Sequence, residues 1–307
     1  MNRPLFIKSI RQRISCRTYD GRVPDEETKG RLRAFFRENT RGPFGNPLRF
    51  ELIDLTEAER AELKSLGTYG VIKGAGLFIA GAVTRGARSM EDFGFGMERN
   101  ILFATTLGLG TCWLGGTLNR AGFARKIALE PGELMPAISP VGHPAGKRSL
   151  TDRAFRFMAK SDKRKPWQEL FFDGRPDTPL SRELAGPLGE VLEAVRIGPS
   201  ASNRQPWRIV REGAAFHLFL ARTPGYDKML GEIRLQEVDM GIALCHFELA
   251  AGELGVRGSW REAKPSFAAG VWEYVVSWTL DWQGVEKQLV TQAVQTCFDA
   301  RRANPEE

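Results

Sequence analysis

A cation, a hydroxyl and a second cation alternate near the N-terminus of the chain, as Arg13, Ser15 and Arg17. In an extended segment alternate residues face the same side, so these three side chains could converge on one ligand. Two guanidinium groups and a hydroxyl suit a phosphate dianion, because arginine offers forked hydrogen-bond donors. Strings of this kind are also common on protein surfaces, and the spacing alone leaves both interpretations open.

A second candidate is the loop at residues 198–207, GPSASNRQPW. Small hydroxyl residues beside an asparagine, bounded by prolines, give short and rigidly held hydrogen-bond partners for a polyol or the edge of a heterocycle. The same pattern could be only a well-capped turn. Trp207, which follows Pro206, is expected to pack as a structural anchor.

Glycines cluster in the segment 108–116, GLGTCWLGG. They follow a helix-like stretch and open a strand-like one, so the spacing does not match the GxGxxG pattern of dinucleotide-binding folds. Gly115 and Gly116 could let backbone N–H groups approach a flat ligand. A helix C-terminus followed by a strand edge would explain the same glycines.

Cysteines and histidines lie far apart, with no CxxC pair and no metal-ligand spacing. We therefore expect no metal site and no Ser–His–acid or Cys–His catalytic group, and we interpret the cysteines as buried or free thiols of a reducing cytosol. No apolar signal core opens the chain, and no stretch approaches the roughly 20 apolar residues of a membrane span. A cytoplasmic protein without a membrane partner is expected. The cysteines are Cys16, Cys112, Cys245 and Cys297.

The net charge of +7 is concentrated in one segment. Residues 147–165 carry eight basic side chains against two acidic ones, with an apolar stripe at helical spacing. Such a segment could meet a phosphate, a nucleic acid or an acidic membrane surface, or it could be a solvated helix face. It lacks interleaved aromatic residues for base stacking, so no nucleic-acid partner is expected.

The chain repeats itself. Residues 92–113 align without gaps on residues 239–260, and seven of the 22 positions are identical. The loop at 42–50 resembles the loop at 198–209, and both precede a strand-like stretch. We infer an internal duplication with halves at 1–173 and 174–307. The long helices expected near 92–108 and 239–255 would pack together, as in a covalent version of a symmetric dimer, which favours a monomer in solution.

The sequence resembles the nitroreductase family of FMN-dependent oxidoreductases over nearly its full length, and more narrowly the subgroup with two nitroreductase-like halves in one chain. The resemblance implies an α+β fold, with antiparallel-type sheets flanked by helices and the halves forming an intramolecular pseudo-dimer. The segments that carry it are RISCRTY (13–19), residues 92–116, GHPAGKR (142–148), KRKPWQELFF (163–172) and PSASNRQPW (199–207).

One complete FMN site is implied by this resemblance. The phosphate would meet the N-terminal arm and the basic residues near 164, the second half would lend its loop, and the flavin ring would lie beside the stretch that follows the first long helix. The implied cofactor-binding residues are Arg13, Ser15, Arg17, Trp113, Leu114, Gly115, Gly116, Lys163, Arg164, Pro199, Ser200, Ala201, Ser202, Asn203 and Gln205.

Departures from the family pattern point to a single FMN per chain. The second half has no RxSxR counterpart ahead of its PSASN loop, and the corresponding loop of the first half, at 42–46, lacks both serines. These losses fall on the two contributions to the same second site. Ile14 stands where the family usually has an arginine, so phosphate affinity is expected to depend more on Arg17 and Arg164.

The implied activity is a ping-pong oxidoreductase cycle, in which NADH or NADPH delivers hydride to flavin N5 and a nitroaromatic, quinone or similar small acceptor takes the electrons. The cofactor supplies the chemistry in this class, so no catalytic side chain is predicted. The main alternative is a non-catalytic protein of the same fold that binds FMN for storage or sensing.

Overall fold

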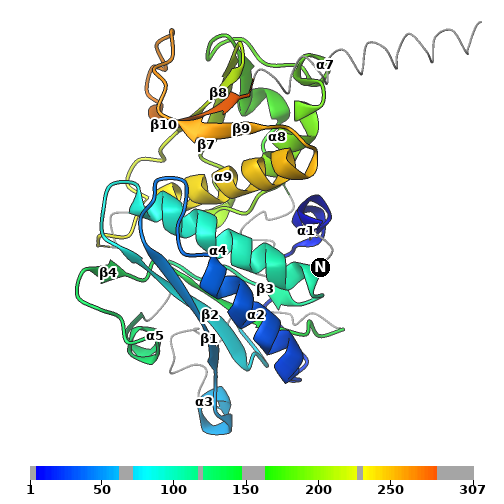
Figure 1. Cartoon of the computed structure of the whole chain (residues 1–307), viewed down its shortest axis with the longest axis vertical. Helices are drawn as coiled ribbons and strands as arrows, with labels where there is room; N and C mark the ends of the chain where they lie inside the picture. Colours follow the sequence, from blue (N-terminus) through cyan, green and yellow to red (C-terminus); the bar gives the residue numbers. More distant parts are fainter. Residues whose placement is uncertain (1–4, 62–71, 117–119, 147–162, 227–230, 282–307) are drawn as a thin grey trace, which may run out of the picture.

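The structure, a computed structural model, describes residues 5–61, 72–116, 120–146, 163–226 and 231–281. Most of the basic segment at 147–165, and Cys297, lie outside the described residues. The described chain has an α+β fold in which helices separate two five-stranded sheets (Figure 1). This confirms the predicted fold class.

The N-terminal half begins with a short helix and contains the first sheet. An aspartate caps its second helix: the Asp25 carboxylate accepts the Thr28 backbone N–H at 2.8 Å, and Glu26 and Glu27 occupy the first turn. The elements are α1 (Phe6–Gln12), α2 (Glu26–Glu38), β1 (Leu48–Asp54), α3 (Glu57–Ala61), β2 (Leu77–Thr84), α4 (Ser89–Thr106), β3 (Gly110–Thr111), α5 (Arg120–Lys126), β4 (Glu133–Leu134) and β5 (Ile138–Gly142).

The rest of the described chain contains the second sheet. Its loop after α8 includes one turn of 3₁₀ helix, and a long helix again precedes the last strands. The elements are η2 (Trp167–Glu169), β6 (Phe171–Asp173), α7 (Arg182–Ala185), α8 (Leu188–Arg196), η3 (Ala201–Asn203), β7 (Trp207–Glu212), β8 (Ala215–Leu220), α9 (Leu235–Glu253), β9 (Gly258–Arg261) and β10 (Glu273–Leu280).

The first sheet has the order β1-β2-β5-β3, with β4 also paired to β2, and all its pairs are antiparallel. The second has the order β6-β7-β8-β10-β9 and is antiparallel except for β6 and β7. The apolar run in β2 is buried along nearly its whole length, as expected of a strand covered on both faces. Helix α4 covers one face of the first sheet, and Phe123 of α5 packs against Phe78 on the other.

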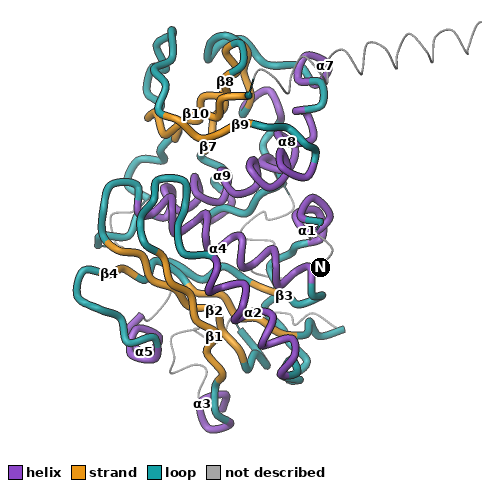
Figure 2. The backbone as a smooth tube through the Cα atoms, viewed as in Figure 1, coloured by secondary structure: helices purple, strands orange, loops and turns teal. Residues whose placement is uncertain are grey.

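Helices α4 and α9 pack against each other between the two sheets (Figure 2). They cross at one glycine from each half. A Cβ atom on Gly94 would lie 2.1 Å from the Val238 carbonyl oxygen, and one on Gly241 would lie 2.0 Å from that of Glu91. The two glycines are 147 residues apart, which is the offset of the sequence repeat. The predicted packing of the long helices is therefore confirmed, and it explains why both copies of the repeat have glycine here.

An aspartate two residues before each of these glycines holds the Gly-Pro loop of its own half. Asp92 accepts the backbone N–H groups of Phe44 and Asn46, both at 2.8 Å, and Asp239 accepts the N–H of Ala201 at 2.9 Å. Burial raises the pKa of Asp92, while these hydrogen bonds oppose the shift. The repeated aspartate is thus a loop anchor.

Strand β6 crosses between the halves. It precedes the predicted boundary after residue 173, yet it pairs in parallel with β7 of the second sheet, with Phe171 opposite Ile209. If the chain divides at that boundary, the first half lends an edge strand to the sheet of the second. The division into halves at 1–173 and 174–307 remains a proposal.

Candidate functional site

A cavity of about 600 Å³ lies between the N-terminal arm, the segment that follows β3 and the loop before β7, so both halves line it. This size is within the usual range for small-molecule sites. Thirteen of the fifteen predicted cofactor-binding residues line it: Arg13, Ser15, Arg17, Trp113, Leu114, Gly115, Gly116, Arg164, Pro199, Ser200, Ala201, Ser202 and Asn203.

The N-terminal arm is extended directly after α1. Ser15 forms a β-bridge with Thr111, and the Cys16 backbone N–H donates to the Thr111 carbonyl at 2.8 Å. This pairing turns Arg13, Ser15 and Arg17 toward the cavity and leaves Cys16 buried. The predicted convergence of the three alternate side chains is what the structure shows.

Beneath the arm lies a buried polar cluster around Glu98 of α4. One carboxylate oxygen accepts the Trp113 indole N–H at 2.6 Å, and the other lies 2.9 Å from His246 Nε2 of α9 and 3.9 Å from Arg13 Nε. His246 Nδ1 in turn faces the Ala194 carbonyl at 2.8 Å. One carboxylate therefore positions two cavity residues of the first half and is held by the second.

Arg13 is short of hydrogen-bond partners. Its side chain is only 6% exposed. Among the described residues, nothing accepts a hydrogen bond from its buried Nη1. Burying a charged donor without a partner is costly, so this nitrogen could take an acceptor that the described residues do not supply.

The loop at 199–205 is held in a strained conformation. Ser202, Asn203 and Gln205 have φ angles of 48°, 55° and 49°, in the left-handed region that non-glycine residues rarely adopt. Each such residue costs about 1 kcal/mol or more, so the surrounding contacts must enforce the shape. Ser200 Oγ accepts the Gln205 N–H at 2.9 Å, and Ser202 Oγ accepts the Tyr226 hydroxyl at 2.8 Å. Because each serine hydroxyl accepts, its own hydrogen can be donated to a ligand.

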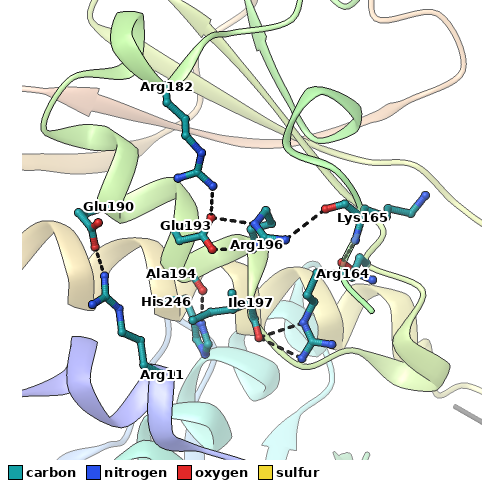
Figure 3. Close-up of polar contacts among 11 residues, drawn as sticks. Arg11, Arg164, Lys165, Arg182, Glu190, Glu193, Ala194, Arg196, Ile197 and His246 are labelled. Carbon is teal, nitrogen blue, oxygen red and sulfur yellow. Dashed lines mark hydrogen bonds and ion pairs between the residues drawn. The ribbon is translucent and has the colours of Figure 1, made fainter. Parts of the chain in front are cut away.

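Arg164 fastens this loop to the end of α8 (Figure 3). Its Nε and Nη2 both donate to the Ile197 carbonyl at 3.2 Å, and its Nη1 donates to Asn203 Oδ1 at 3.1 Å. A guanidinium at the C-terminal end of a helix also meets the negative end of the helix dipole. On the other side of α8, Arg11 of α1 forms an ion pair with Glu190.

Two predicted residues, Lys163 and Gln205, support the loop without lining the cavity. The Lys163 carbonyl accepts a hydrogen bond from Asn203 Nδ2 at 2.7 Å, and Lys163 is an exposed residue. Gln205 is buried, and its Oε1 accepts the Lys165 N–H at 2.8 Å. The sequence did not predict the other residues that line the cavity, although Asp239 is one of the residues that the repeat shares. These residues are Ile10, Arg11, Ile14, Cys112, Ala137, Ile197, Tyr226, Leu235, Val238, Asp239 and Ile242.

Comparison with known families gives a match over most of the chain. A family model described as "Putative TM nitroreductase" matches residues 6–251. The chain belongs to this family. A comparison with curated proteins finds no match.

Solved structures resemble this chain over most of its length or over about half of it. A protein named a "putative nitroreductase" from Thermotoga maritima is 21% identical with a TM-score of 0.57, and the match covers 90% of this chain and 93% of that one. Two others match about half: a "putative nitroreductase" in complex with FMN from Desulfovibrio desulfuricans (25%, TM-score 0.38, 50% and 96% covered) and an FMN-dependent nitroreductase from Clostridium difficile (17%, 0.37, 47% and 90%).

Elsewhere in the described chain, a serine, a histidine and an acidic residue lie in contact, an arrangement not apparent from their spacing in the sequence. His217 of β8 lies 2.6 Å from Ser277 Oγ through Nδ1 and 3.1 Å from Glu212 through Nε2, and the Tyr274 hydroxyl lies 2.8 Å from Ser277 Oγ. Ser277 and His217 are buried on the second sheet and line neither cavity. The group is structural, because a substrate cannot reach the serine.

His217 should make the protein sensitive to mild acid. Burial lowers its pKa below the usual 6.5, more than Glu212 raises it. Below about pH 6.5 the unfolded chain therefore binds a proton that the folded chain does not, so this contribution to stability is present above pH 6.5 and is lost as the pH falls through the lowered pKa. Urea unfolding between about pH 7.5 and 5 should show a smaller loss for His217→Gln than for the wild type. Parallel pH curves would contradict this.

Three of the cysteines, Cys16, Cys112 and Cys245, are buried free thiols, as predicted. The described residues contain no group of three or more His, Cys, Asp or Glu side chains placed to hold a metal ion. Among the described helices, none has the length and apolar character that a membrane span needs.

Proposed function

We propose that the chain binds one FMN in the cavity between its halves and works as a monomeric NAD(P)H-dependent reductase of small acceptors such as nitroaromatics and quinones. The observation that carries the proposal is the buried Arg13 guanidinium, whose Nη1 has no partner among the described residues and which lines a cavity with apolar walls elsewhere. A phosphate at the arm and a flat aromatic ring against the walls would satisfy both features.

Arg13, Ser15 and Arg17 would hold the phosphate. Arginine at 13 can offer Nη1 without giving up another contact, whereas Arg164 already donates to Ile197 and Asn203. We therefore assign the main phosphate contact to Arg13, rather than to Arg17 and Arg164 as the family comparison favours. Arg164 would act through the loop that it positions.

Trp113, Leu114, Gly115 and Gly116 would lie beside the ring, opposite Leu235, Val238 and Ile242 at the start of α9. These apolar residues exclude water and leave the ring's polar edge to the loop. The hydroxyl hydrogens of Ser200 and Ser202 are available for that edge, because both oxygens already accept from the protein. Bound FMN would supply the redox chemistry, taking hydride from a nicotinamide cofactor and passing electrons to the acceptor.

The purified protein should be yellow and should release about one FMN per chain. Anaerobic mixing with NADH and with NADPH should bleach the bound flavin much faster than either bleaches free FMN, since orientation in a closed site is worth several kcal/mol of barrier. Light scattering should give the mass of one chain, because α4 and α9 already bury the interface between the halves.

Each outcome has a distinct meaning. Bound FMN that is reduced no faster than free FMN would support the storage or sensing alternative. Two FMN per chain would contradict the single site, and a chain that cannot be loaded with FMN would contradict the whole proposal. A cytoplasmic location stays a prediction from the cysteine pattern.

A further inference from the structure

A second cavity, of about 910 Å³, lies on the other side of the helix pair. Trp260 and Pro43 line it, and they are the repeat counterparts of Trp113 and Pro199 in the first cavity. It therefore occupies the place where the internal duplication would put a second ligand. Its chemistry differs, because Phe6 of α1 and Phe35 of α2 line it, and its arginines are Arg99 and Arg257.

Two buried donors at this cavity have no acceptor in the described part of the chain: Arg99 Nε of α4 and Trp278 Nε1 of β10. Gly258 packs directly against the indole nitrogen, since a Cβ atom at 258 would lie 2.4 Å from it. Buried polar atoms normally have partners, and two such donors lining one cavity indicate a ligand that carries acceptors.

The acids of the cavity are already engaged. Glu253 accepts the Ile7 N–H at the start of α1 at 2.9 Å, and Glu248 accepts the Trp260 indole N–H at 2.8 Å. Arg257 and Asp281 are exposed at the rim. Burial also raises the pKa of Glu248. Arg99 is thus the inner charge without a hydrogen-bonded partner among the described residues.

Four aromatic side chains line the cavity together with aliphatic ones. Trp260 and Trp278 meet edge to face with their ring centroids 4.9 Å apart, and Phe6 and Phe35 approach from the first half. Aromatic walls favour a flat apolar ligand, and unpaired donors favour a carboxylate on it.

We propose that this second cavity binds a small aromatic carboxylic acid, with the carboxylate accepting from Arg99 and Trp278. The site is separate from the proposed FMN site and does not depend on that function. The second ligand position of the duplication would thus bind a different class of molecule, beside the same two helices, α4 and α9.

Calorimetric titration of the FMN-saturated protein with 1-naphthoate tests the proposal, with 1-naphthalenemethanol as the uncharged probe. Naphthoate should bind, and the alcohol should bind at least about tenfold more weakly, since a hydrogen bond to a charged group contributes that much. Arg99→Met should weaken naphthoate by about tenfold or more, and Trp278→Phe, which keeps a ring but removes the donor, by about threefold to tenfold.

Arg13→Met, in the first cavity, is the matched control and should leave naphthoate binding unchanged. The proposal is wrong if naphthoate does not bind, if it binds only when FMN is absent, or if neither Arg99→Met nor Trp278→Phe weakens it. Because the readout is naphthoate binding, failure here leaves the FMN proposal intact. If the chain takes up no FMN, the same titration is made on the flavin-free protein. The proposal then requires that Arg99→Met weakens naphthoate binding and that Arg13→Met does not.

Discussion

Replacing Gly241 with alanine should lower the free energy of unfolding by about 3 kcal/mol or more, although alanine is the better helix former. The added methyl would lie 2.0 Å from the Glu91 carbonyl oxygen and 2.7 Å from the Phe95 nitrogen, both backbone atoms of α4. Backbone cannot move aside as a flexible side chain can, so the two helices must separate. Urea unfolding of the purified variant measures the loss.

Two glycines in exposed helical positions provide controls. Gly252 of the same helix and Gly30 of α2 have nothing within 4 Å of an added Cβ atom. Gly252→Ala and Gly30→Ala should each stabilise the protein, by up to about 1 kcal/mol. Gly94→Ala should resemble Gly241→Ala, and the double variant should lose less than the sum, because both changes act on one crossing. A Gly241→Ala protein as stable as the wild type would refute the close crossing.

Replacing Arg13 with methionine should raise the dissociation constant for FMN by about 10- to 100-fold, the worth of a hydrogen bond to a charged group in a buried site. Methionine keeps the apolar stem but removes the donor that lacks a partner among the described residues. Fluorescence titration of the flavin-free variant measures the affinity, and the melting temperature with and without FMN checks that the protein is folded.

Arg11→Met is the matched control two residues earlier. Arg11 also lines the cavity, but it is half-exposed and pairs with Glu190, so its loss should change FMN affinity by no more than about threefold. Arg13→Lys should fall between the two, since lysine keeps the charge and loses the fork. If Arg13→Met binds FMN normally while Arg17→Met does not, the phosphate lies where the family comparison puts it.

Two kinds of structural feature could be predicted from the sequence: those that repeat in both halves and those that depend on neighbouring residues. Gly94 and Gly241 stand at the same place in both copies because each meets backbone of the other helix, so the duplication alone was enough to predict the central packing. The alternate facing of Arg13, Ser15 and Arg17 needed only an extended backbone. These features depend on neighbouring residues or on the repeat, and both are visible in a single chain.

What the sequence left undetermined depends on contacts between distant segments. Glu98 and His246 are 148 residues apart, and their contact requires the two halves to pack in one register. His217 and Ser277 meet only because β8 and β10 are neighbours. The pairing of β6 with the second sheet likewise has no local signal, since two phenylalanines and an aspartate fit either half.

The contact between α4 and α9 has a consequence for how a ligand enters and leaves the first cavity. Many proteins with a site between two domains open it by a hinge in the connection. Here Gly94 and Gly241 hold the two helices in backbone contact, so rigid-body opening of the halves would break this packing. Ligand exchange should therefore depend on local movement of the strained loop at 199–205, and its rate on the contacts that hold this loop.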